Sequence, residues 1–167
     1  IERSKGSSLR TVDDFANLSR VLVERGDIDA SRKIAADMKR EWRGDKQAEL
    51  AALVTESLCL HAEGAEEKAR GLVDQALALQ QQAREEAAAK GRQLSQRLTV
   101  DLAHACYAAG KEDAANGIMR QMAAENHEDP HLINHITSVF ERTGQAAAGK
   151  AILDQVGKEI VDLNNRG

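Results

Sequence analysis

The stretch HACYAAGKEDAANGIM, residues 104–119, decides the fold because it contains a helix, a glycine turn and the start of a second helix. Residues that favour helices lie on both sides of Gly110. The same pattern recurs at residues 20–34, 59–73 and 138–153. Each copy is centred on one glycine, and these turn glycines are Gly26, Gly64, Gly110 and Gly144. The sequence therefore predicts repeated helix–turn–helix units.

Two columns of small residues flank the turn glycines. The residue seven places before the glycine is Ser19, Ser57, Ala103 or Thr137. The residue five places after it is Ser31, Ala69, Ala115 or Gly149. Antiparallel helices joined by a short turn approach closely only where neither carries a large side chain. We therefore expect the two columns to meet where the helices cross, and we expect each turn glycine to be left-handed.

The composition predicts an all-α fold. Good helix formers dominate, the chain has one proline, and the alternation typical of strands is scarce. We expect helices at residues 11–25, 28–42, 46–63, 65–90, 93–109, 111–125, 130–143 and 145–157. Asp129 followed by Pro130 favours a helix start. The polar, Ala-rich residues 80–91 favour extra turns on the fourth helix.

Length and charge exclude several classes of protein. A chain of 167 residues with 42% hydrophobic and 30% charged residues is typical of one soluble domain. Its apolar runs are shorter than the roughly 20 residues of a membrane span. A net charge of −4 gives no overall attraction to nucleic acid. Cys59 and Cys106 lie in apolar helical stretches, which favours buried thiols in a reducing cytoplasm over a disulfide or a reactive thiol.

The repeat resembles the tetratricopeptide repeat (TPR) superfamily, whose signature runs W-x2-L-G-x2-Y, then A-x3-F, then P. The first half of the signature matches at Phe15, Leu18, Ser19 and Leu22, at Thr99, Leu102, Ala103 and Cys106, and at Ile133, Ile136, Thr137 and Phe140. The second half matches at Ala69 and Val73, Ala115 and Met119, and Gly149 and Leu153. Two departures are Glu56 in the second unit and the pair Ala30 and Ile34, where the first turn looks one residue short. The turn glycines are 38, 46 and 34 residues apart, and only the last separation equals the family's repeat length.

The resemblance implies a right-handed α-solenoid of about four stacked hairpins, forming a single domain over residues 11–167 after a flexible segment over residues 1–10. In that family a concave groove lined by first-helix residues binds other proteins. The corresponding positions here are Arg20, Val23, Val54, Leu58, His61, Arg97, Val100, His104, Tyr107, Asn134 and His135. A partner helix or extended peptide with apolar anchors would suit these residues. The alternative is that several of them pack between the units.

No catalytic residue, metal site or cofactor is predicted, and we expect a protein that is not an enzyme. The strongest rival is HEDPHLINH, where His131 and His135 share a helix face and His127 is nearby. It lacks an H-E-x-x-H arrangement, so a solvated helix start is the favoured interpretation. The sequence has no G-x-S-x-G elbow, phosphate-binding Gly loop or Cys–His motif.

The two ends of the sequence favour a piece of a longer protein. The chain begins IERSKGSSL, without an initiator Met or an apolar signal core. Residues 158–167 are similar to the opening of a fifth unit's first helix. Ile160, Val161 and Leu163 would then leave an apolar edge through which a homodimer could form.

The expected function is a non-catalytic scaffold that binds a protein or peptide partner in the groove. The last unit also resembles the TPR region of bacterial response regulators that carry a receiver domain. The alternative function is therefore an oligomerisation or output domain of a bacterial signalling protein.

Overall fold

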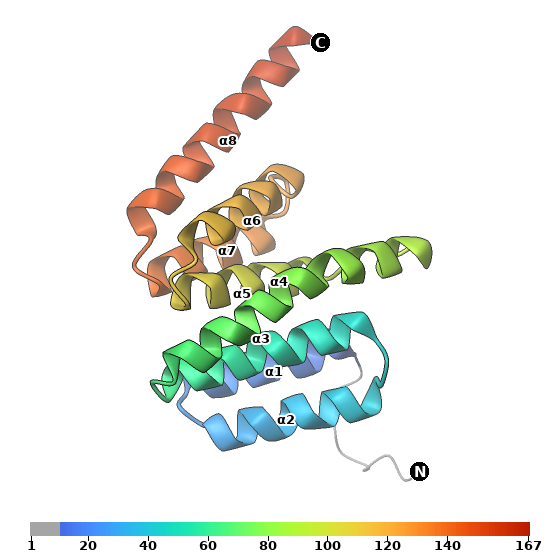
Figure 1. The fold of residues 1–167 in the computed structure, drawn as a ribbon. Coiled ribbons are helices and arrows are strands. Elements are labelled where there is room, and N and C mark those ends of the chain that lie inside the picture. Colours follow the sequence, from blue (N-terminus) through green and yellow to red (C-terminus); the bar gives the residue numbers. More distant parts are fainter. Residues whose placement is uncertain (1–10) are drawn as a thin grey trace. The chain divides into compact units, whose positions relative to one another are not determined.

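The computed structural model describes residues 11–167, and this part of the chain forms eight α-helices and no strand (Figure 1). The helices are α1 Val12–Glu24, α2 Ile28–Glu41, α3 Lys46–Ala62, α4 Glu66–Ala89, α5 Gln96–Ala108, α6 Glu112–Glu125, α7 Pro130–Arg142 and α8 Ala146–Arg166. The all-α class is confirmed, and every predicted helix boundary except the end of α8 is correct to within three residues. The flexible segment predicted for residues 1–10 lies outside the described residues.

The helices divide into two compact units. The first ends at Leu94 and contains α1 to α4, and the second runs from Ser95 to Gly167 and contains α5 to α8. Consecutive helices pair in four hairpins, α1–α2, α3–α4, α5–α6 and α7–α8. The single repeat domain expected over residues 11–167 stays a prediction.

The same backbone motif closes all four hairpins. The turn glycines Gly26, Gly64, Gly110 and Gly144 have φ angles of +81°, +80°, +76° and +72°. The residue after each glycine donates a backbone hydrogen bond of 2.8–2.9 Å to the carbonyl five residues before it, as Asp27 does to Leu22. The glycine itself donates to the carbonyl three residues back. These paired bonds form the Schellman motif, so the predicted left-handed turns are confirmed.

The predicted crossing of small residues is seen within the hairpins. Ser19 and Ser31 are both fully buried, and the Ser31 hydroxyl donates a 2.8 Å hydrogen bond to the Ser19 carbonyl. Ala103 and Ala115 are likewise fully buried in the α5–α6 hairpin. The turn of the first hairpin is not short, because Ser31 and Ala35 are buried whereas Ala30 and Ile34 are partly exposed. Ala30 and Ile34 therefore matched the TPR signature poorly because the signature had been aligned one residue out of register.

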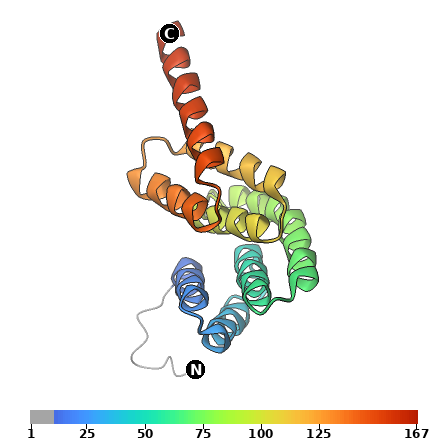
Figure 2. The same cartoon turned by 90° about the vertical axis from the view of Figure 1, so that its left-hand side faces the viewer.

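In the first unit, α1, α2 and α3 each pack against the other two, and α4 packs on α3. Figure 2 views the first three helices nearly along their axes. Phe15 and Trp42 meet edge to face with ring centroids 5.1 Å apart, which joins α1 to the end of α2. As predicted, the segment after residue 80 extends α4 by further turns, and α4 is longer than α3 (Figure 1).

In the second unit, α7 packs on α5 and α6, and α8 packs on α6 and α7. The predicted start of α7 is confirmed, since the Asp129 carboxylate accepts hydrogen bonds from the backbone N–H groups of His131 and Leu132. The predicted end of α8 at residue 157 is wrong. The helix continues to Arg166, so residues 158–166 extend the last hairpin and do not begin a fifth one. A single helical glycine, Gly157, costs only about 1 kcal/mol and does not end the helix.

Candidate functional site

The first unit carries an open groove of about 540 Å³ between α2 and α4, with α3 beneath it. Its lining residues are Arg32, Ala35, Ala36, Lys39, Glu49, Ala52, Leu53, Glu56, Leu72 and Leu79. Aliphatic side chains from all three helices form the floor. The charged side chains come from α2 and α3 and form the rim. A groove of this kind matches the amphipathic surface of a helix or peptide.

The local sequence explains why α4 lines this groove with leucines. Leu72 and Leu79 are seven residues apart, which is two helical turns, so they lie on one face. Val73 and Ala76 between them are 1% exposed, whereas both leucines are partly exposed. The α4 helix therefore buries one face in the unit and presents a second apolar face to the groove.

An ion cluster fixes α2 to α3 at one end of the groove. The Arg32 Nε group donates to both carboxylate oxygens of Glu56, at 3.1 and 3.0 Å, and Arg32 Nη2 also bonds to Glu63. The bonds to Glu63 and Glu56 raise the pKa of Arg32 above its ordinary value. The Arg32 guanidinium in turn lowers the pKa of Glu63. Glu56, which departs from the TPR signature, is therefore the acceptor in a contact between hairpins.

Five of the predicted groove residues lie in the first unit, and two of them are buried. Val54 and Leu58 are 3% and 6% exposed, so they present little surface to a partner. Val23 is partly exposed. Arg20 forms an ion pair with Glu24, and His61 Nδ1 lies 2.9 Å from the Glu66 carboxylate. None of the five lines the 540 Å³ groove.

Six of the predicted groove residues lie in the second unit, and they are Arg97, Val100, His104, Tyr107, Asn134 and His135. Arg97 and Asn134 are exposed, His104 is partly exposed, and Val100 and Tyr107 are 0% and 7% exposed. The Tyr107 hydroxyl donates a 2.6 Å hydrogen bond to Asn116. Burial raises the pKa of Tyr107 to about 12. The exposure of these six residues does not decide whether they form a binding groove. The apolar ones, Val100 and Tyr107, serve mainly as core residues.

The histidines around Pro130 have separate contacts. His135 Nε2 lies 2.9 Å from Asp101 Oδ1, which links α7 to α5, and both side chains are about one-tenth exposed. His127 Nδ1 lies 3.1 Å from the Ala124 carbonyl. Among residues 11–167 there is no cluster of three potential metal ligands.

Both cysteines are buried free thiols, as expected. Burial raises the pKa of the Cys59 thiol, and its Sγ lies 3.7 Å from the Ser31 hydroxyl. A raised pKa disfavours the thiolate and lowers the reactivity of the group. Cys59 is thus a packing residue where α3 meets α2.

Sequence reasoning missed the groove of the first unit. Its only advance signal was the pair Leu72 and Leu79, two apolar residues outside the columns that pack the hairpins. Within the described chain, no helix combines the length and apolar character that a membrane crossing requires. Comparison with protein-family models, curated proteins and solved structures finds no match. The TPR relationship therefore stays a prediction.

Proposed function

We propose that this chain is a non-catalytic helical-repeat module of the TPR type, and that its first unit binds a helix or peptide of a partner protein. The observation that carries the proposal is the 540 Å³ groove, because an apolar floor with a charged rim is the surface that an amphipathic segment requires. The repeat assignment is supported by the four Schellman turns and by the small residues at the helix crossings.

The chemistry of the groove specifies the partner segment. Leu72 and Leu79 leave room for apolar anchors spaced by about two helical turns or the equivalent extended length. Lys39 is exposed on the rim and makes no ion pair among the described residues. The partner is therefore an amphipathic segment with aliphatic anchors and an acidic side chain that faces Lys39.

The test is selection of peptides from a random library displayed on phage, with the whole chain as bait. Each enriched peptide is then titrated, by fluorescence anisotropy, into the unaltered chain, Lys39→Glu and Leu72→Glu/Leu79→Glu. Lys39→Glu changes an exposed side chain and therefore tests the groove without loss of the fold. The matched control is Lys158→Glu, which makes the same change of charge as Lys39→Glu at an exposed lysine of the second unit.

We expect acidic, aliphatic peptides whose affinity falls about tenfold in Lys39→Glu, and more in the double variant, without change in Lys158→Glu. Failure to enrich any peptide, or equal affinities for all four proteins, would contradict the assigned groove.

A second candidate function is self-association through the last helix, in line with the predicted homodimer edge. It is favoured by Val161 and Leu163, which are 56% and 68% exposed on α8. Light scattering over a range of concentrations tests it. A dimer that Val161→Glu/Leu163→Glu converts to a monomer would support self-association, and a concentration-independent monomer would exclude it.

A further inference from the structure

The last two turns of α8 continue past the helices on which α8 packs (Figure 1). The helix buries Gly149, Ile152 and Val156, which follow one another at helical spacings of three and four residues. The same face continues to Ile160, which is partly exposed, and to Leu163, which is 68% exposed. Every residue after Ile160 is exposed. An apolar face of α8 therefore extends beyond the part that the second unit covers.

Two charged residues flank this apolar face. Glu159 and Arg166 are seven residues apart, or two helical turns, and both are exposed. Each lies within about 60° of Leu163 around the helix axis. The Glu159 carboxylate accepts a 3.2 Å hydrogen bond from Gln155 of the same helix. The end of α8 therefore presents a leucine between an acid and a base.

The groove of the first unit carries charges at the same spacing. Arg32 and Lys39 are seven residues apart on α2 and line the groove from one side. Glu49 and Glu56 are seven residues apart on α3 and line it as well. Arg32 bonds to Glu56 across the antiparallel pair of α2 and α3, and the same register places Lys39 opposite Glu49. The charges of the groove therefore form two levels, two helical turns apart.

The two levels differ in net charge. At one level Lys39 is opposite Glu49, whose carboxylate lies 3.8 Å from Lys46, so two cations accompany one acid. At the other level Arg32 bonds to two glutamates, so two acids accompany one cation. A helix in the groove is therefore favoured when it places an acid near Lys39 and a base two turns away.

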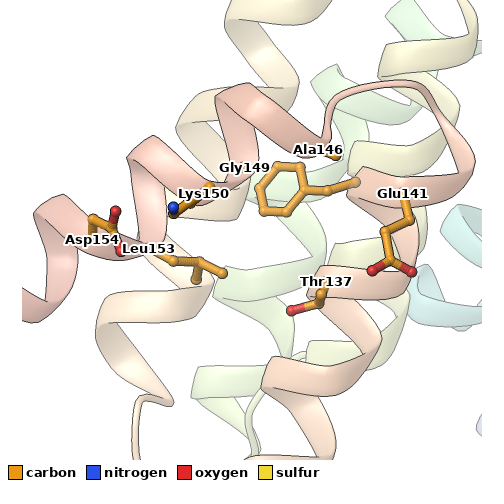
Figure 3. A pocket seen from close by; sticks show the side chains of 8 residues that line it. Thr137, Glu141, Ala146, Gly149, Lys150, Leu153 and Asp154 are labelled. Atoms are coloured by element: carbon orange, nitrogen blue, oxygen red, sulfur yellow. The ribbon is translucent and has the colours of Figure 1, made fainter.

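The second unit has a hollow of its own, between α7 and α8, but it suits such a segment less well (Figure 3). Its volume of about 240 Å³ is less than half that of the groove. Its charged lining residues are Glu141, Lys150 and Asp154, so two acids accompany its one cation. The ring of Phe140 leaves no room for a Cβ atom at Gly149. The end of α8 therefore finds its better match in the groove of the first unit.

We propose that the groove of the first unit binds the last two turns of α8 from a second copy of this chain. This inference rests on the proposed function, for which it names the partner. Leu163 lies on the aliphatic floor. Glu159 faces Lys39 and Arg166 faces Glu56, so the bound helix runs antiparallel to α2. Because the groove and the helix end belong to different units of the chain, association is head-to-tail, and copies add one after another unless a ring closes.

The test is the association constant of the whole chain, measured by sedimentation velocity over a range of concentrations. Lys39→Glu changes the groove, Glu159→Lys changes the helix end, and a third variant carries both changes. Circular dichroism checks that each variant is folded. The matched control is Glu128→Lys, which makes the same change as Glu159→Lys at a side chain that is 90% exposed and lies outside α8.

We expect each single variant to weaken association about tenfold, because the reversed charge turns an attraction into a repulsion. The combined variant should restore most of the association, since the two exchanged charges meet between copies. Glu128→Lys should leave it unchanged. A chain that is monomeric at all concentrations would overturn the proposal, and so would a combined variant as weak as the single ones. Association that Lys39→Glu leaves unchanged would assign the contact to α8 alone and would also overturn it.

The peptide selection described above distinguishes this failure from a failure of the proposed function. If the chain is monomeric but enriched peptides lose affinity in Lys39→Glu, the groove binds a different protein, and only the second copy is excluded as its partner. If no enriched peptide depends on Lys39 either, the proposed function fails as well.

Discussion

The hydroxyl of Ser31 on α2 lies 2.8 Å from the backbone carbonyl of Ser19 on α1, and both residues are fully buried. The contact requires that the two helix backbones approach closely, and a side chain larger than serine at either position would separate them. The same geometry places Ala103 and Ala115 in the core of the third hairpin. In these two hairpins the small residues found in the sequence are therefore buried between the helices.

Ala115→Leu is expected to lower the free energy of unfolding by roughly 1–3 kcal/mol, because the added methyl groups overpack the crossing with Ala103. Urea denaturation followed by circular dichroism measures the loss. Ala147→Leu is the control, since Ala147 is exposed on α8 and the same change there should stay within about 0.5 kcal/mol. Equal stabilities of the two variants would show that the crossing of α5 and α6 can accommodate a larger side chain.

Gly149→Ala is expected to destabilise the chain although alanine favours helices. A Cβ atom at Gly149 would overlap two ring carbons of Phe140, so the ring would have to move. At Gly157 and Gly117, which are also helical, a Cβ atom meets nothing within 4 Å. Alanine at those two positions should stabilise by about 0.5–1 kcal/mol. Thermal unfolding of the three variants measures these effects. The same change from glycine to alanine should lower the stability at Gly149 and raise it at Gly157 and Gly117.

The positions of seven helices and the four turns could be predicted because they depend on local chemistry. Gly26 and its counterparts end helices through their own backbone conformation, and Asp129 begins α7 through its own side chain. Such signals lie within a few residues of the feature they determine. The columns of small residues repeat in every hairpin, and this repetition allowed the helix crossings to be predicted as well.

The site could not be predicted because it depends on contacts between distant residues. The pairing of Arg32 with Glu56 and Glu63 joins residues 24 and 31 positions apart. The groove residues were predicted from the positions that line the groove in the TPR family. This prediction placed Val54 and Val100 in a binding surface, whereas both are buried. The end of α8 was misplaced for a related reason. Residues 158–166 match both the start of a new helix and the continuation of the old one.

Arg32→Ala is expected to lower the free energy of unfolding by at most about 1 kcal/mol, since Arg32, Glu56 and Glu63 have side chains that are 31%, 37% and 42% exposed. The loss should shrink as salt is added, because salt screens exposed charges. Urea denaturation at low and high ionic strength measures both effects. Arg40→Ala, which removes an ion pair within α2 whose arginine is 78% exposed, is the control and should have a smaller effect.

The same ion cluster should depend on pH with a defined sign. Pairing with Arg32 lowers the pKa of Glu63 below its ordinary value of 4.5. The contribution of Glu63 to stability is therefore fully present above that value and is lost as the pH falls through the lowered pKa. The difference in free energy of unfolding between Arg32→Ala and the unaltered chain should become smaller as the pH falls over this range. A difference that stays constant as the pH falls would exclude an ionic contribution.

Tyr107 is expected to titrate well above the ordinary range of tyrosine. Its ring packs at 6.1 Å from that of Phe140, its hydroxyl donates to Asn116, and burial raises its pKa from 10.0 to about 12. It is the only tyrosine of the chain, so the phenolate absorbance reports on it alone. The folded protein should show a midpoint near pH 12, and the protein in urea should show one near 10.

The shift also sets the sign of a stability change at high pH. Because the unfolded chain releases the Tyr107 proton first, the stabilising contribution is complete below pH 10 and disappears as the pH rises towards 12. Tyr107→Phe keeps the ring but loses the hydrogen bond to Asn116, at a cost of about 1 kcal/mol, and it removes this part of the pH dependence. The free energy of unfolding of both proteins, measured from pH 8 to pH 11 in urea, is the check. Circular dichroism shows whether the chain is folded during the titration. If the folded chain has its titration midpoint at the ordinary value for tyrosine, the Tyr107 hydroxyl is open to solvent. The contact between α5 and α6 would then be looser than the 2.6 Å hydrogen bond to Asn116 implies.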